Sequence, residues 1–185
     1  MISEALKLKT RNDHDDLEGG FNLKDFTSSS YKLVSVLKAF YGFYIPVEVE
    51  LKKFESEFKS AGINLEERLK SHLLENDLED QGISANSFSH IPRATEIPQI
   101  KSLSDAFAVL YVLEGSTMGG QIISKELAKS DLSSIYFNPY KEKTMPMWMQ
   151  FKNALNQLPE SEEDQMVQTA RSTFSSLGKW LRSST

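Results

Sequence analysis

Apolar residues recur at helical spacing along almost the whole chain. The first helix is predicted over residues 3–18, where steps of four, four and three residues form a stripe of Leu6, Thr10, His14 and Leu17. Two glycines at 19 and 20 predict the usual glycine end for this helix. No alternating run of Val, Ile and Thr, and no Asn-Gly or Asp-Gly turn, indicates a strand.

The same periodicity continues to the end of the chain. Helices are predicted over about 30–58, 65–80, 103–123, 148–158 and 160–181, with loops at 21–30, 81–102 and 135–146. Pro46 should kink the second helix, because its ring removes an amide donor. Ser102 and Asp105 form a capping-box pair at the start of the 103–123 helix. We therefore expect one all-α domain over residues 1–185, a single helical bundle.

Charge and composition remove several classes of protein. The formal net charge is −5 and no large basic face is apparent, so a nucleic-acid partner is not expected. The chain has no cysteine, which excludes disulfides, thiolate nucleophiles and thiolate metal sites. No run approaches the roughly 18 apolar residues of a membrane span, and the charged first residues lack a signal-peptide pattern. We expect a soluble, cytoplasmic protein without a membrane partner.

The stretch LEGSTMGGQII, residues 113–123, places three glycines inside an apolar helix. Each costs about 1 kcal/mol relative to alanine. A phosphate-binding loop would need a lysine after the last glycine and a strand before the first, and a membrane GxxxG face would need a longer apolar segment. Close helix packing, or a flat bulky ligand lying against bare backbone, would each explain the glycines. The spacing alone does not decide between these two.

A planar ligand that carries a metal would need an imidazole on its other side, and the chain has three histidines. His72 lies among glutamates and His90 in a polar loop, which is typical of surface residues. His14 lies on the apolar stripe of the first helix. Glu18, one turn later, could accept the Nδ1–H of His14 and leave Nε2 free for a metal. A buried core histidine and a solvated carboxylate are the alternatives.

Three stretches resemble the heme oxygenases: ALKLKTRNDHDDLE, YKLVSVLKAFYGFYIPVEVEL and LYVLEGSTMGGQII. The resemblance runs over nearly the whole chain and is greatest to the bacterial branch often associated with phytochromes. The Thr-xxx-His-xxx-Glu element, which begins at Thr10, is modest alone. Together with the later Gly-x-x-x-Gly-Gly-Gln helix, in this order, it is specific.

The resemblance implies a role for each matching residue. His14 would be the axial iron ligand and Glu18 its hydrogen-bond partner. The opposite, distal face of the heme would be bordered by the catalytic stretch of Gly115, Ser116, Gly119 and Gly120. Basic positions near the heme propionates would be Lys7, Arg11 and Lys152, and Phe174 would help to wall the pocket. Ser116 stands where many members carry an aspartate, so the anchor of the distal water is left open.

The implied activity opens heme, using O₂ and electrons, to biliverdin, CO and Fe²⁺. Heme is then both substrate and cofactor, with its iron held by the protein. The chain shows no flavin or nicotinamide fingerprint, so an external ferredoxin or flavodoxin would supply electrons, and a bacteriophytochrome would accept the biliverdin. The main alternative is a heme-binding or carrier protein that does not degrade its ligand. A thiaminase-type hydrolase would need a cysteine, which the chain does not have. A di-iron oxidase would need repeated Glu-x-x-His sets, and none of the three histidines has a glutamate three residues before it. A helical interaction module leaves the glycines unexplained.

Overall fold

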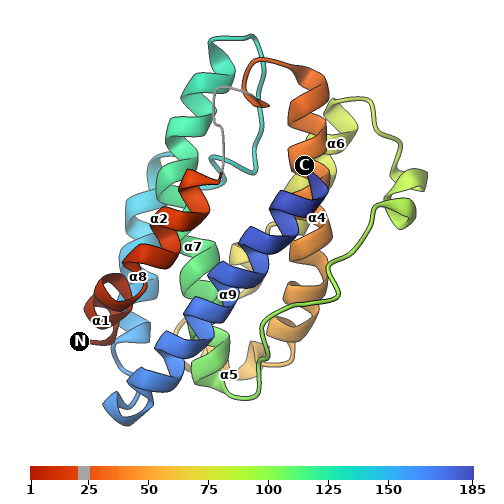
Figure 1. Cartoon of the computed structure of the whole chain (residues 1–185). Helices are drawn as coiled ribbons and strands as arrows, with labels where there is room; N and C mark the ends of the chain where they lie inside the picture. Colours follow the sequence, from red (N-terminus) through yellow and green to blue (C-terminus); the bar gives the residue numbers. More distant parts are fainter. Residues whose placement is uncertain (21–25) are drawn as a thin grey trace.

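A computed structural model describes residues 1–20 and 26–185, and these residues form helices without any strand (Figure 1). The α-helices are α1 (Ile2–Lys9), α2 (Arg11–Gly19), α4 (Ser30–Lys52), α5 (Glu55–Ser60), α6 (Ser71–Asp80), α7 (Leu103–Ala128), α8 (Thr144–Leu155) and α9 (Glu163–Ser184). Short 3-10 turns are η1 (Glu66–Arg68), η2 (Ala85–His90), η3 (Lys141–Lys143) and η4 (Glu160–Glu162). The predicted all-α class is confirmed. The first half of the predicted 21–30 loop, residues 21–25, lies outside the described residues.

Helix α7 is the central element. It packs against α9 and α8, while α4 packs against α6 and α9, and both α1 and α2 lie on α9 (Figure 1). The predicted capping box is confirmed, because Ser102 accepts a hydrogen bond from the Asp105 amide and the Asp105 carboxylate accepts one from Ser102. Contrary to expectation, α7 is long and apolar enough to cross a membrane. However, 61% of that apolar window is buried inside the protein, as in the core helix of a soluble protein.

The predicted first helix is two helices, not one. The chain bends at Thr10, whose φ of −109° and ψ of 11° are not helical. The Leu6 carbonyl accepts both the Thr10 backbone amide, at 2.9 Å, and the Thr10 hydroxyl, at 2.7 Å, so two hydrogen bonds hold this buried threonine at the bend. Helix α2 ends at Gly19 as predicted, but Gly20 is right-handed, with φ −77° and ψ −9°, and not the left-handed glycine cap expected.

Helix α4 is continuous through Pro46 but ends at Lys52, earlier than predicted, and α5 follows as a separate helix. Pro46 has no N–H for the carbonyl of Gly42, and the amide of Ala94 donates to that carbonyl instead, at 3.0 Å. Gly42 also allows close packing, because an added Cβ would lie 2.4 Å from the Pro92 carbonyl oxygen. The 81–102 connection is therefore attached directly to the backbone of α4.

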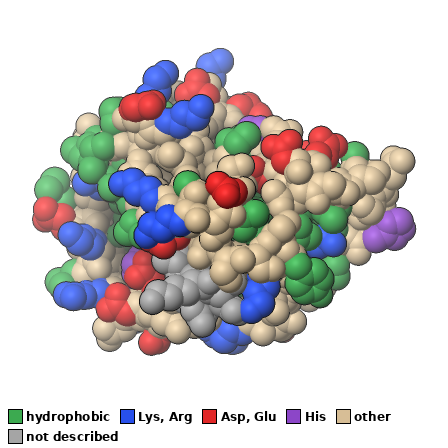
Figure 2. Space-filling view, turned by 90° about the horizontal axis from the view of Figure 1, so that it is seen from above, with side chains coloured by type: hydrophobic (Ala, Val, Ile, Leu, Met, Phe, Trp, Pro, Cys, Tyr) green, Lys and Arg blue, Asp and Glu red, His purple; other side chains and the backbone are tan. Residues whose placement is uncertain are grey.

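The predicted 65–80 helix forms only from Ser71. The backbone amide of Lys70 donates to Glu48 Oε1 at 2.6 Å, and that of Ser71 donates to the same atom at 3.1 Å. A buried carboxylate of α4 thus caps α6 at this point, and the residues before it form the turn η1. Of the later helices, α7 continues beyond the predicted end at 123 to Ala128, and α8 begins at Thr144, inside the predicted 135–146 loop, and ends at Leu155. Helix α9 runs over Glu163–Ser184, where 160–181 was predicted. Figure 2 shows acidic and basic side chains interspersed on one face of the molecule.

Candidate functional site

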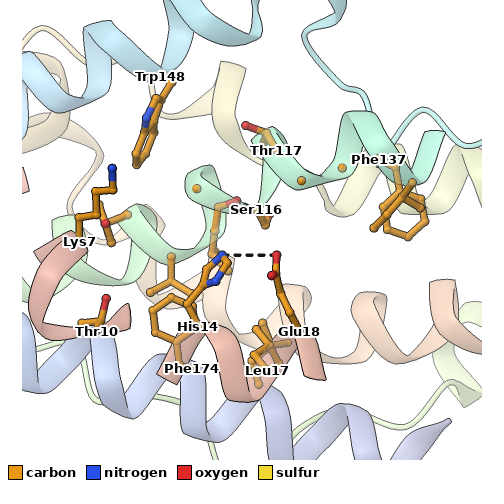
Figure 3. Close-up of a pocket in the computed structure, with 18 of the residues that line it drawn as sticks. Lys7, Thr10, His14, Leu17, Glu18, Ser116, Thr117, Phe137, Trp148 and Phe174 are labelled. Atoms are coloured by element: carbon orange, nitrogen blue, oxygen red, sulfur yellow. Dashed lines mark hydrogen bonds and ion pairs between the residues drawn. The ribbon is translucent and has the colours of Figure 1, made fainter. Parts of the chain in front are cut away.

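A cavity of about 1240 Å³ lies between α2 and α9 on one side and α7 on the other (Figure 3). It exceeds the ~300–1,000 Å³ typical of small-molecule sites. Most of its surface is apolar, with aromatic side chains from α4, α7, α8 and α9 and from the connection before α8. The cavity is lined by every residue that the sequence analysis assigned to the site: Lys7, Thr10, Arg11, His14, Glu18, Gly115, Ser116, Gly119, Gly120, Lys152 and Phe174. Segments far apart in the chain therefore meet at one site.

His14 faces this cavity from α2 (Figure 3). Its side chain is 49% exposed, so the interpretation as a buried core histidine is wrong. The imidazole meets the ring of Phe174 edge-on, with centroids 6.0 Å apart. The other two histidines, His72 and His90, are exposed and do not line the cavity, as expected for surface residues.

The contacts of the His14 ring differ from those predicted. Nε2, and not Nδ1, faces Glu18, at 3.6 Å from Oε1, while Nδ1 lies 3.6 Å from Asp15 Oδ1. Neither distance is a close hydrogen bond. Ligation of a metal would require the ring to exchange one of these carboxylates for the metal. Among residues 1–20 and 26–185, no group of three or more His, Asp or Glu side chains could hold a metal ion by itself.

The presence of the three glycines in α7 has two different structural explanations. An added Cβ on Gly115 would meet only Trp148, at 3.9 Å, and one on Gly119 would meet only Glu18 Oε1, at 3.8 Å. An added Cβ on Gly120 would lie 2.3 Å from the carbonyl oxygen of Phe137. Close packing therefore explains Gly120, and it involves the connection before α8 and not another helix. Gly115 and Gly119 instead leave bare backbone beside the cavity, opposite α2.

Three basic side chains border the cavity. Lys7 is exposed and lines the cavity from α1 (Figure 3). Arg11 is 77% exposed and lies 3.8 Å from Asp15, and the Lys152 ammonium lies 5.8 Å from the centre of the Trp148 ring. An apolar interior with cations at its border suits a ligand that has an apolar body and an anionic edge.

The glycine-bearing wall carries two hydroxyl groups, those of Ser116 and Thr117, but its described lining residues include no acid. Ser116 and Thr117 each donate to a carbonyl of their own helix, those of Leu113 and Glu114, at 2.7 Å. Tyr111, Tyr44 and Tyr136 also line the cavity. Burial raises the pKa of Tyr111 to about 12, and burial also raises the pKa of Tyr44 and of Tyr136 above the ordinary value. All three phenols are therefore protonated at neutral pH. The carboxylates among the described lining residues, Glu4 and Glu18, belong to α1 and α2.

Sequence reasoning missed a buried charge cluster beside the glycines, formed by Glu114, Arg68, Lys70 and Tyr140. Lys70 Nζ lies 2.5 Å from Glu114 Oε1, the Tyr140 hydroxyl donates to the same oxygen at 2.7 Å, and Arg68 pairs with the other oxygen. The three charged side chains are 1–2% exposed. The available signal was Glu114 itself, because a carboxylate that follows an apolar run needs a buried cation.

We expect Glu114→Gln to lower the free energy of unfolding by about 3–5 kcal/mol, because it leaves two buried cations without an anion. Burial opposes the charged form, but Lys70 and Arg68 outweigh it, so the pKa of the Glu114 carboxyl lies below its ordinary value. Its contribution is therefore complete above the pKa of an unfolded glutamate, about 4.3, and is lost as the pH falls through the lower folded pKa. Urea unfolding of both proteins from pH 7 to pH 3 measures this. A pH-independent difference would contradict the charge argument, and Tyr140→Phe should cost only about 1 kcal/mol.

Comparisons with known proteins bear on the family and the fold of the chain. The heme oxygenase family model matches residues 1–183. The fold is similar to heme oxygenase from Neisseria meningitidis in its NO- and CO-bound forms, with a TM-score of 0.81, 23% identity, and coverage of 100% of this chain and 92% of that chain. The corresponding values are 0.79, 19%, 98% and 98% for heme oxygenase from Leptospira interrogans. For heme oxygenase-1 from the cyanobacterium Synechocystis in complex with heme they are 0.76, 16%, 98% and 91%. No sequence among the curated proteins matches the chain.

Proposed function

Since the chain belongs to the heme oxygenase family of enzymes, we propose that it opens heme, with O₂ and external electrons, to biliverdin, CO and Fe²⁺. One observation carries the proposal for this particular chain. A single imidazole faces bare glycine backbone across an apolar cavity of about 1240 Å³. Such a slot suits a flat ligand whose metal needs only one protein ligand, because a porphyrin supplies four nitrogens itself.

His14 would hold the heme iron through one ring nitrogen. Glu18 lies 3.6 Å from Nε2 and Asp15 lies 3.6 Å from Nδ1, so whichever carboxylate faces the other ring nitrogen would orient the imidazole. Lys7, Arg11 and Lys152 would pair with the propionates. This role is supported by their position on the border of the cavity and by their charge. Phe174 restricts the imidazole by its edge-on contact, and Thr10 holds the bend that turns α2 toward the cavity.

Bound heme supplies the iron at which O₂ is reduced, and its own ring is the group that is oxidised. The chain contributes the surroundings on the α7 side. Gly115 and Gly119 allow close approach of the ring to the helix. The hydroxyls of Ser116 and Thr117 keep lone pairs that can accept a hydrogen bond, and the neutral phenol of Tyr44 lies within hydrogen-bond reach of Ser116. Because this wall carries no carboxylate, it provides positioned hydrogen bonds without a strong acid.

The proposal extends to the partners and the location of the protein. A ferredoxin- or flavodoxin-type donor would supply the electrons, since the sequence has no flavin or nicotinamide motif of its own. A bacteriophytochrome would accept the biliverdin, as in the bacterial branch that the sequence resembles. We also propose that residues 1–185 act as one domain in the cytoplasm; the continuous hydrophobic core supports the single domain.

The test is turnover of one equivalent of hemin by the purified protein with a reductant in air. We expect a Soret band that forms on binding and then decays as the absorption of biliverdin appears. The same mixture without O₂ should keep its Soret band, which controls for loss of heme by other routes. A Soret band that also persists in air would instead favour the heme-carrier alternative, with Ser116 as the first residue to examine.

A further inference from the structure

The connection between α7 and α8 forms part of the cavity wall through Tyr136 and Phe137. Both side chains are buried. The Tyr136 ring packs against two rings of α4, with its centroid 5.0 Å from that of Phe40 and 5.5 Å from that of Tyr44. These wall residues do not belong to an α-helix, so helical hydrogen bonding does not fix their position. Contacts from outside the segment must do so.

Helix α6 supplies such a contact through Asp77, which is 3% exposed. Its Oδ2 accepts hydrogen bonds from the Ser134 hydroxyl at 2.6 Å and from the backbone amide of Tyr136 at 2.9 Å. Its Oδ1 accepts one from the backbone amide of Ile135 at 2.7 Å. One carboxylate therefore holds three successive residues, and it does so without lining the cavity itself.

Helix α7 restrains the same connection by close contact. The carbonyl of Phe137 lies so near Gly120 that an added Cβ would be 2.3 Å from its oxygen. The wall is therefore held by the hydrogen bonds that it donates to Asp77 of α6 and by direct backbone contact with α7. If the bonds to Asp77 were lost, the ring contacts with α4 and the contact at Gly120 would remain, but the backbone of residues 134–136 would lose the acceptor that fixes its position.

We propose that Asp77 is a positioning residue for the substrate. By holding residues 134–136 it fixes the wall formed by Tyr136 and Phe137, and this wall fixes how the porphyrin lies in the cavity. The inference rests on the proposed function, because it takes a porphyrin as the ligand. Asp77 acts through the backbone of the connection and does not touch the reacting atoms.

Asp77→Asn tests the inference with almost no change in shape. An amide replaces one oxygen by an NH₂ group, so the backbone amide of Ile135 or that of Tyr136 faces a donor and loses its acceptor. We expect the affinity for metal-free protoporphyrin, measured by its fluorescence and independent of iron ligation by His14, to fall roughly tenfold. With hemin, the relative amounts of the biliverdin isomers, separated by chromatography, should differ from those formed by the unmutated protein.

Asp105→Asn is a matched control. Asp105 is also 3% exposed, and it accepts hydrogen bonds from the amides of Lys101 and Ser102 and from the side chains of Gln165 and Thr169. It lies at the start of α7, outside the cavity. We expect this variant to melt at a lower temperature and to keep wild-type affinity for protoporphyrin. Ser134→Ala removes only one of the three bonds to Asp77 and should lose about threefold in affinity; it decides the question if Asp77→Asn does not fold.

Wild-type affinity in Asp77→Asn, or an equal loss of affinity in Asp105→Asn, would overturn the positioning role. Two results for the unmutated protein separate this from the proposed function. If it binds protoporphyrin but leaves hemin intact in air, the proposed function fails. The protoporphyrin affinities of the unmutated protein and of Asp77→Asn still test the positioning role in that case. If it opens hemin but does not bind protoporphyrin, the proposed function stands, and the positioning role is overturned because the wall does not hold the porphyrin ring itself.

Discussion

Replacing His14 with alanine should reduce the opening of the heme ring by at least roughly a hundredfold. Loss of residues that only support a metal ligand already costs 10–100-fold, and His14 is the proposed ligand itself. Hemin should still enter the apolar cavity, but without the absorption spectrum of an axial histidine. The measurement combines a hemin titration, followed at the Soret band, with the rate at which biliverdin forms.

The chain offers its own controls for this variant. His72→Ala and His90→Ala remove exposed imidazoles that do not line the cavity, so both variants should keep the wild-type spectrum and rate. Added imidazole should restore the spectrum of His14→Ala by filling the vacated position. An unchanged spectrum in His14→Ala would show that the iron ligand has been assigned to the wrong residue.

Gly119→Leu should suppress ring opening by roughly a hundredfold or more while leaving the unliganded protein as stable as before. An added Cβ at Gly119 meets only Glu18 Oε1, at 3.8 Å, so the unliganded helix accepts a side chain there. Leucine is also favoured over glycine in a helix by nearly 1 kcal/mol, which offsets the cost of its exposure to the cavity. The porphyrin would have to lie where the leucine now projects. Urea unfolding and the hemin assay measure the two effects separately.

Gly120→Ala should behave in the opposite way, although the two glycines are adjacent. Its Cβ would be 2.3 Å from the Phe137 carbonyl oxygen, so the connection must move, at a cost of about 1–3 kcal/mol in unfolding free energy. The pair separates the two explanations for a glycine-rich helix. If Gly119→Leu opened hemin at the wild-type rate, the idea that bare backbone admits the ring would be wrong.

Local patterns in the sequence predicted much of this fold. Helical spacing gave the class, and the Ser102–Asp105 pair gave the start of α7. The bend at Thr10 was missed, because a threonine at that position also fits an uninterrupted apolar stripe. The apolar stripe and the glycine pattern indicated a shared site for His14, Gly115 and Gly119, and all three line one cavity. This could be predicted because the position of each residue on its helix decides which way it faces.

Contacts between distant segments could not be predicted in the same way. Asp77 bonds to residues 134–136, and Glu114 bonds to Lys70, but neither partner has a spacing that marks it. Gly120 looked like its neighbour Gly119 until the Phe137 carbonyl was seen beside it. The orientation of the His14 ring was also beyond the pattern, since Asp15 and Glu18 are both near enough in sequence to pair with either nitrogen.

The large cavity also means that the substrate completes the interior of the protein. A ligand that binds only the folded state stabilises it by about 2.7 kcal/mol at a concentration one hundred times its Kd. The chain is therefore most resistant to unfolding while it holds heme, and least resistant once its product has left. Its lifetime in a cell would then follow the supply of heme, so that the enzyme persists when heme is present and is degraded sooner when heme is absent.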